Sequence, residues 1–162
     1  MNTLSTIKTL KETDQDFEWY PTSTEMIDCI KKDLIQYHYD FEKSEKVLGR
    51  VDCLDCGAGD GRVVKALANG GNAYAIEKSK HLITTMDPDI FIVGTDFLQT
   101  TLIDKKVQVV FSNPPYSEYE TWVRKIILEA NADYMYFIIP QRWESSQLIK
   151  SAIETRQVQA EI

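Results

Sequence analysis

Hydrophobic and polar positions follow two different patterns on either side of residue 50. In the first part, Met26, Ile27, Ile30, Leu34 and Ile35 recur at helical spacing, which predicts a helix over residues 24–39. A polar, Thr-rich lead precedes it, and Thr22-Ser23-Thr24-Glu25 has the form of a capping box. Residues 40–50 are charged and read as a connector. We therefore expect a helical lead over about residues 1–50 and a core domain over 51–162.

From Val51 onward, short apolar runs alternate with amphipathic segments. The apolar runs predict strands at 51–56, 72–77, 89–97, 107–112 and 134–140. Helices are predicted at 62–69, at 79–86, after a capping box formed by Ser117 and Glu120, and at 144–156, and the final VQAEI has the form of a strand start. This order predicts an α/β fold, a mostly parallel sheet with helices on both faces, in a single domain spanning 1–162.

Composition and charge narrow the class of protein. The chain has 162 residues and a net charge of -7, and no basic patch is visible, which weighs against tight nucleic-acid binding by this chain alone. No segment reaches membrane-spanning length and no signal peptide is visible, so a cytoplasmic protein without membrane contact is expected. Cys53 and Cys56 have C-x-x-C spacing, but no second pair accompanies them, and we predict neither a metal nor a redox site.

The stretch Asp55-Cys56-Gly57-Ala58-Gly59-Asp60-Gly61 follows the first predicted strand and opens a helix. Glycines at alternate positions allow a tight turn and a close backbone approach by a ligand. Glu77 closes the next strand 22 residues after Asp55, a spacing at which an acid accepts hydrogen bonds from ribose hydroxyls. An acid in place of the dinucleotide fingerprint favours a cofactor that carries positive charge.

The stretch Phe111-Ser112-Asn113-Pro114-Pro115-Tyr116 ends the fourth predicted strand. Pro114 has no N–H and holds Asn113 extended, so strand pairing stops at the carboxyl edge of the sheet, where ligands of open α/β folds bind. The Asn113 side-chain oxygen and the Pro114 carbonyl form a rigid pair of acceptors for a planar NH2 group. Tyr116 supplies an aromatic face on which a base or amide can stack.

These motifs resemble those of the class I S-adenosylmethionine-dependent methyltransferases, and FSNPPY narrows the resemblance to the amino-methyltransferases, of the N6-adenine DNA methyltransferase type. The resemblance spans roughly residues 17–143 and implies a Rossmann-like fold. It implies that Asn113, Pro114 and Tyr116 are catalytic. The cofactor-binding residues that it implies are Tyr20, Thr22, Asp55, Gly57, Gly59, Gly61, Glu77, Asp96, Phe97 and Asn113.

Within that set, the resemblance assigns the cofactor ribose to Glu77 and the adenine to Asp96 and Phe97. Tyr20 and Thr22 lie in FEWYPTS, which resembles a segment that closes over the methionine part of the cofactor, with Pro and Thr in reversed order. Trp143 is expected to be a surface-anchored core aromatic, and His38 and His81 are expected to lie outside the catalytic site.

The resemblance implies transfer of a methyl group from S-adenosylmethionine to an exocyclic amine, with N6 of adenine in DNA as the expected acceptor. Methylation of a protein glutamine or an RNA base, or a non-catalytic cofactor-binding subunit, remain the alternatives. The family fold has seven strands and only five are found here, so the chain is expected to lack the last strands. It is then a fragment of a longer enzyme or depends on an additional DNA-recognition domain or subunit.

Overall fold

The computed structural model describes residues 3–13, 18–37 and 48–162. Its elements are α1 (Thr3–Glu12), α2 (Thr24–Tyr37), β1 (Cys53–Cys56), α3 (Arg62–Ala68), β2 (Ala73–Ile76), α4 (Lys80–Thr85), β3 (Ile90–Gly94), β4 (Val109–Ser112), α5 (Tyr119–Glu129), β5 (Tyr134–Phe137), the 3-10 helix η1 (Gln141–Ser145) and α6 (Gln147–Arg156). No helix in these described ranges is long and apolar enough to cross a bilayer.

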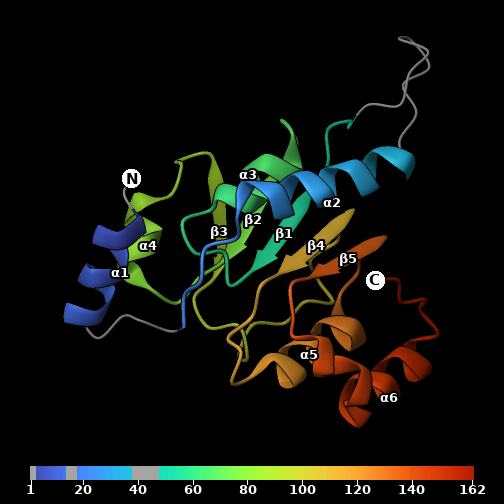
Figure 1. Cartoon of the computed structure of the whole chain (residues 1–162). Helices are drawn as coiled ribbons and strands as arrows, with labels where there is room; N and C mark the ends of the chain where they lie inside the picture. The colour runs from blue at the N-terminus through green and yellow to red at the C-terminus, as the bar shows by residue number, and fades with distance from the viewer. Residues whose placement is uncertain (1–2, 14–17, 38–47) are drawn as a thin grey trace.

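The strands form one parallel sheet in the order β3-β2-β1-β4-β5. Figure 1 shows α2 and α3 on one face of this sheet and α5 and α6 on the other. Each face has its own apolar core. On β1, Cys53 packs in the core beneath α2 and α3, whereas Leu54 and Cys56 pack in the core beneath α5. The predicted α/β architecture with helices on both faces is confirmed.

The local predictions differ from the structure mainly at helix starts and at the end of the chain. Thr22 was predicted to cap the helix at 24–39, but Ser23 Oγ accepts the Met26 N–H at 3.3 Å instead, since the Thr22 hydroxyl contacts Asn113. That helix ends at Tyr37 in the described part, and residues 38–39 lie outside it. Residues 158–162 form no strand.

The capping box predicted between Ser117 and Glu120 is absent. Helix α5 begins at Tyr119 without a side-chain cap. The Ser117 hydroxyl and backbone N–H both donate to the Glu18 carboxylate instead, and hydrogen bonds to a charged acceptor are stronger than those between neutral groups. The segment around Glu18 is thereby tied to the loop that follows β4.

The sheet order places the two predicted motifs side by side. The chain moves outward from β1 to β2 and β3, then crosses back to β4 on the other side of β1. Asp55 of β1 is paired in register with Phe111 of β4, and the Ser112 hydroxyl donates to the Cys56 carbonyl at 2.8 Å. Gly57 and Asn113 therefore follow neighbouring strands at the topological switch point, where open α/β sheets bind ligands.

Candidate active site

A cavity of about 330 Å³ lies at the carboxyl ends of the strands. Its volume is at the small end of the range for ligand sites. The predicted site residues that line it are Tyr20, Thr22, Asp55, Gly57, Glu77, Asp96, Phe97 and Asn113. They come from the N-terminal lead and from the loops after β1, β2, β3 and β4, so the parallel sheet gathers residues that are far apart in sequence.

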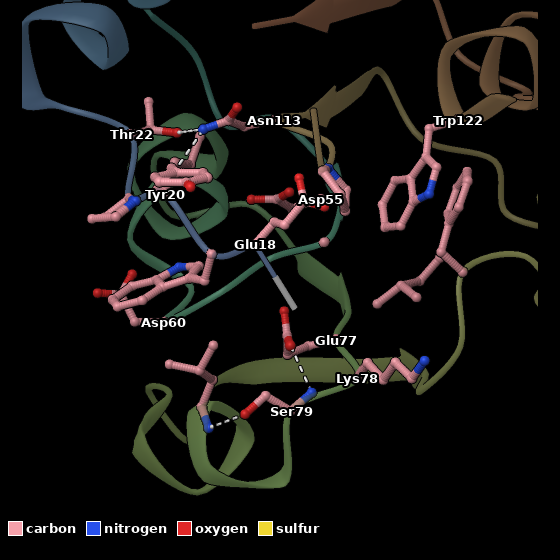
Figure 2. Close-up of a pocket in the computed structure, with 18 of the residues that line it drawn as sticks. Glu18, Tyr20, Thr22, Asp55, Asp60, Glu77, Lys78, Ser79, Asn113 and Trp122 are labelled. Carbon is pink, nitrogen blue, oxygen red and sulfur yellow. Dashed lines mark hydrogen bonds between the residues drawn. The ribbon is translucent and has the colours of Figure 1, made fainter. Parts of the chain in front are cut away.

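Asp55 is a buried carboxyl group in the wall of this cavity (Figure 2). Its side chain is 1% exposed, and Oδ1 has no hydrogen-bond partner among the described residues. Burial raises the pKa of the carboxyl well above its ordinary 3.8, and the charges of Glu77 and Asp60 raise it further. A cationic ligand group would satisfy the orphaned oxygen and reverse this penalty.

The Glu77 carboxylate links two backbone segments, which makes it a brace between them. Its Oε2 accepts the Gly59 N–H at 2.7 Å, and its Oε1 accepts the Ser79 N–H at 2.7 Å. Burial raises the pKa of this carboxyl, while the hydrogen bonds from Ser79 and Gly59 act in the opposite direction. Each carboxylate oxygen can accept a second bond, so a ribose contact remains compatible with the brace.

Two glycines of the loop after β1 lie directly against tryptophan rings. Gly59 has φ 59°, and a side chain there would overlap the Trp19 ring. Gly57 has φ 85°, and a Cβ there would lie 3.1 Å from a Trp122 ring carbon. Gly61 does not line the cavity; its Cα faces Ile90 of β3. The predicted close approach at the glycine loop is thus made in part by the protein's own aromatic side chains.

Asn113 is oriented by the N-terminal lead. Its Nδ2 donates to the Tyr20 carbonyl at 2.9 Å and to the Thr22 hydroxyl at 3.3 Å, as Figure 2 shows. Both amide hydrogens are directed to the lead, and Oδ1 has no partner among the described contacts. The side-chain oxygen is therefore free of described hydrogen bonds, and Asn113 lines the cavity; its role as an acceptor stays a prediction.

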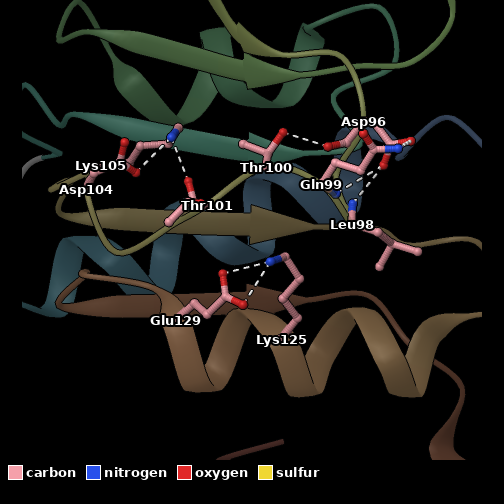
Figure 3. Close-up of polar contacts among 9 residues, drawn as sticks. All are labelled: Asp96, Leu98, Gln99, Thr100, Thr101, Asp104, Lys105, Lys125 and Glu129. Carbon is pink, nitrogen blue, oxygen red and sulfur yellow. Dashed lines mark hydrogen bonds and ion pairs between the residues drawn. The ribbon is translucent and has the colours of Figure 1, made fainter.

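Asp96 and Phe97 line the cavity, and both already contact other residues of the protein. Asp96 Oδ1 accepts the Leu98 N–H at 3.0 Å and the Gln99 N–H at 3.3 Å, so the carboxylate also caps its own loop (Figure 3). The Phe97 ring is 4% exposed and stacks on Trp122, with ring centroids 4.0 Å apart. Trp122 therefore covers one face of the Phe97 ring, the ring on which the adenine was expected to pack.

Pro114 and Tyr116 do not line this cavity. Pro114 is buried, and Tyr116 is 44% exposed beside a neighbouring hollow. The Tyr116 ring lies near that of Tyr20, with centroids 5.9 Å apart. Tyr116 thus stands outside the main cavity, whereas Phe111 of the same stretch lines it.

Sequence reasoning missed Glu18, Trp19 and Trp122. Glu18 has a left-handed backbone with φ 56°, a conformation that side-chain-bearing residues rarely adopt, and its hydrogen bond from the Ser117 hydroxyl lowers the pKa of its carboxyl. Glu18 and Trp19 belong to FEWYPTS, so that motif could have indicated them. Trp122 gave no such signal, because its apolar helical spacing in α5 is that of an ordinary core residue.

The cavity is acidic. Two cationic side chains line it, Arg62 and Lys78, and the Arg62 Nε lies 2.9 Å from both oxygens of the Asp60 carboxylate. The acidic residues among the described lining are Glu18, Asp55, Asp60, Glu77, Asp96 and Glu118. This balance disfavours a pyrophosphate and favours a cationic ligand, in agreement with the acid found at Asp55 in place of a dinucleotide fingerprint.

The remaining chemical candidates lie elsewhere. Cys53 and Cys56 are buried in opposite cores, and burial raises the pKa of each thiol, so the C-x-x-C spacing forms no pair. No cluster of potential metal ligands occurs among the residues that the structure describes. Trp143 packs in the core between α5 and α6 and lines neither cavity, and His38 lies outside the described residues.

Comparison of the fold with solved structures identifies its class. The chain is similar to a ribosomal protein L11 methylase from Lactobacillus delbrueckii subsp. bulgaricus, with TM-score 0.56, 14% identity and coverage of 89% of this chain and 73% of the other. It is also similar to a TehB-like SAM-dependent methyltransferase from Corynebacterium glutamicum, with TM-score 0.54, 15% identity and coverage of 92% and 79%. The chain has the class I methyltransferase fold.

A third similar structure is an S-adenosylmethionine-dependent methyltransferase from Clostridium acetobutylicum, with TM-score 0.54, 14% identity and coverage of 89% of this chain. This chain spans 61% of that protein, and 60% and 65% of two further matches, so it is shorter than these relatives. No protein-family model matches the sequence, and no curated protein sequence matches it. At such low identity the likeness concerns the fold alone.

Proposed function

We propose that this chain is an S-adenosylmethionine-dependent N-methyltransferase whose acceptor is an exocyclic amino group, N6 of adenine in DNA. One observation carries the proposal. Asn113 is held through its amide nitrogen by Tyr20 and Thr22, its Oδ1 has no described hydrogen-bond partner, and it lines the same cavity as the buried Asp55 of the neighbouring strand. An oriented neutral acceptor beside a site for a cation fits transfer of a methyl group from a sulfonium to an amine.

The cavity fits the cofactor chemically. S-adenosylmethionine supplies a methyl group on a positively charged sulfur. Asp55 offers an unpaired, buried carboxylate oxygen to its cationic part, and the acidic lining as a whole favours positive charge. Glu77 would accept the ribose hydroxyls, and Trp122 together with Leu98 would border the base.

The acceptor side rests on Asn113 and Pro114. An amino group that donates one hydrogen to Asn113 Oδ1 and one to the Pro114 carbonyl would be held with its nitrogen fixed. As the carbon–nitrogen bond forms, the bond between the methyl carbon and the cofactor sulfur would break, the sulfur would leave as a neutral thioether, and the extra proton on nitrogen would pass to water. No strong base is required, because this proton leaves only after the carbon–nitrogen bond has begun to form. The contribution of the protein is then orientation and preorganised dipoles. Tyr116, exposed beside this point, would stack on the base that bears the amine.

Labelled S-adenosylmethionine and unmodified DNA test the proposal. We expect transfer to adenine that falls about a hundredfold or more in Asn113→Ala, the loss that follows removal of one oriented polar group from an active site. Asn131→Ala is the matched control, because Asn131 is exposed and contacts its neighbours through its backbone. Undiminished transfer in Asn113→Ala would refute the role of this side chain.

Mass spectrometry of the product separates the alternatives. The Lactobacillus neighbour is named for a protein substrate, so a methylated glutamine in a peptide is the second acceptor to test. A methylated RNA base is the third. Calorimetric binding of S-adenosylmethionine with no transfer to any acceptor would favour a cofactor-binding subunit that acts with a catalytic partner.

A further inference from the structure

A second cavity of about 390 Å³ lies beside the first. Residues 116–121, from the last residue of FSNPPY to the first turn of helix α5, form one side, and Arg142, Ser145 and Ser146 form the other. Ser117 and Glu118 line both cavities. A molecule whose reactive group reaches Asn113 from the Tyr116 side would therefore extend into this second hollow.

Arg142 is the cation of this hollow. Its guanidinium lies over the Tyr119 ring at 5.2 Å from the centroid, and its Nη2 donates to the Tyr116 carbonyl over a long 3.5 Å contact. Within the described residues, no carboxylate lies at salt-bridge distance from it. The side chain is thus placed by neutral groups, and its charge is available to an anion.

Glu118 and Glu120, the acidic residues of the hollow, lie beyond salt-bridge distance from Arg142. Glu118 accepts the Trp122 indole N–H at 3.0 Å, which directs its Oε2 toward the first cavity. Glu120 lies in the first turn of α5, where a negative charge is favourable to the helix dipole. Neither forms an ion pair with Arg142.

Aromatic rings mark the rim between the two cavities. Tyr20 is 61% exposed and Tyr116 44% exposed, and their rings lie at 31° to each other with centroids 5.9 Å apart. Two exposed aromatic faces beside an unpaired cation form the combination that binds a base together with its phosphate. A glutamine side chain would use little of this aromatic surface and none of the charge.

We propose that the second cavity binds a phosphate of the acceptor nucleotide through Arg142, while Tyr20 extends the aromatic platform that Tyr116 offers to the base. This rests on the proposed function, because it assigns the side from which the acceptor reaches Asn113. The acceptor is a nucleic-acid strand with the target base turned out of any duplex, since a base inside a duplex cannot reach the rim. Arg142 binds substrate and takes no part in the transfer.

Equilibrium binding of a short single-stranded deoxyoligonucleotide tests this assignment. In Arg142→Gln we expect about tenfold weaker binding, the loss of one charge-assisted hydrogen bond. The slope of log affinity against log salt should become shallower by about 0.7, the value for one phosphate contact on a single strand. Arg124→Gln is the matched control. Arg124 is exposed on α5 and lines neither cavity, and its replacement removes the same charge from the protein.

The readouts separate this proposal from the proposed function. If Arg142→Gln has the same affinity and salt slope as Arg124→Gln, the phosphate site is wrong. It is also wrong if the wild-type protein does not bind the oligonucleotide and methylates a glutamine peptide. Arg142→Lys should restore part of the binding, which a misfolded variant could not do. The affinity for S-adenosylmethionine should be the same in wild type and Arg142→Gln. A wild-type protein that does not bind S-adenosylmethionine would count against the proposed function alone.

Discussion

The side-chain nitrogen of Asn113 donates to the backbone carbonyl of Tyr20 at 2.9 Å, across 93 positions of the chain. A second bond from the same nitrogen reaches Thr22. The segment before α2 is therefore part of the proposed acceptor site, because it determines which way the Asn113 amide faces. The sequence predicted that Tyr20 and Thr22 contact the cofactor. The structure shows in addition that both residues position the Asn113 side chain.

Thr22→Val should lower the rate of methyl transfer by up to about tenfold, since one hydrogen bond that orients Asn113 is lost. The Michaelis constant for S-adenosylmethionine reports separately on the cofactor contact predicted for Thr22, which lines the cavity. Steady-state kinetics measure both quantities. Thr22→Ser should recover the rate, and Thr24→Val, at an exposed position, serves as the control. Equal rates for Thr22→Val and Thr24→Val would contradict the positioning role.

Asp55→Asn should separate stability from binding. Replacing the buried carboxyl by an uncharged amide of the same shape removes the desolvation cost of its charge and the repulsion by Glu77 and Asp60, so the free energy of unfolding at neutral pH should increase. The dissociation constant for S-adenosylmethionine should rise at least about tenfold. Urea unfolding and calorimetry measure the two effects. A variant that is less stable than wild type and binds normally would disprove the assignment.

Stability should also depend on pH through Asp55. Because its pKa is raised in the folded state above the ordinary 3.8, the folded protein binds the proton more tightly than the unfolded chain. The stabilising contribution is complete below pH 3.8 and is lost as pH rises through the folded pKa. The stability of wild type relative to Asp55→Asn should therefore fall from acid to neutral pH in urea titrations. A flat difference would mean that the carboxyl is not perturbed.

Two of the three tryptophans should report ligand binding. Trp19 and Trp122 line the first cavity, whereas Trp143 packs between α5 and α6. Addition of S-adenosylmethionine should change the indole emission, and Trp19→Phe and Trp122→Phe should each remove part of that change. Trp143→Phe should retain it in full. A signal that disappears only with Trp143 would place the ligand elsewhere.

The strands and both loop motifs could be located from local patterns. Continuous apolar runs specify buried parallel strands, the prolines after Asn113 end β4 at Ser112, and the glycines after Asp55 permit the turn into α3. The order of strands and helices then places the two loops at one edge of the sheet. Each of these properties depends on residues close together in sequence, which is why periodicity and turn chemistry were sufficient.

The partners of each side chain were decided by the tertiary structure. Thr22 and Ser117 both had the sequence signature of a helix cap, yet each bonds to a distant residue, Asn113 and Glu18 respectively. Trp122 looked like a core position of α5 and instead covers Phe97 and Gly57. A local pattern records which conformations a segment can adopt, whereas the choice among competing partners depends on which groups the sheet brings within hydrogen-bonding or stacking distance.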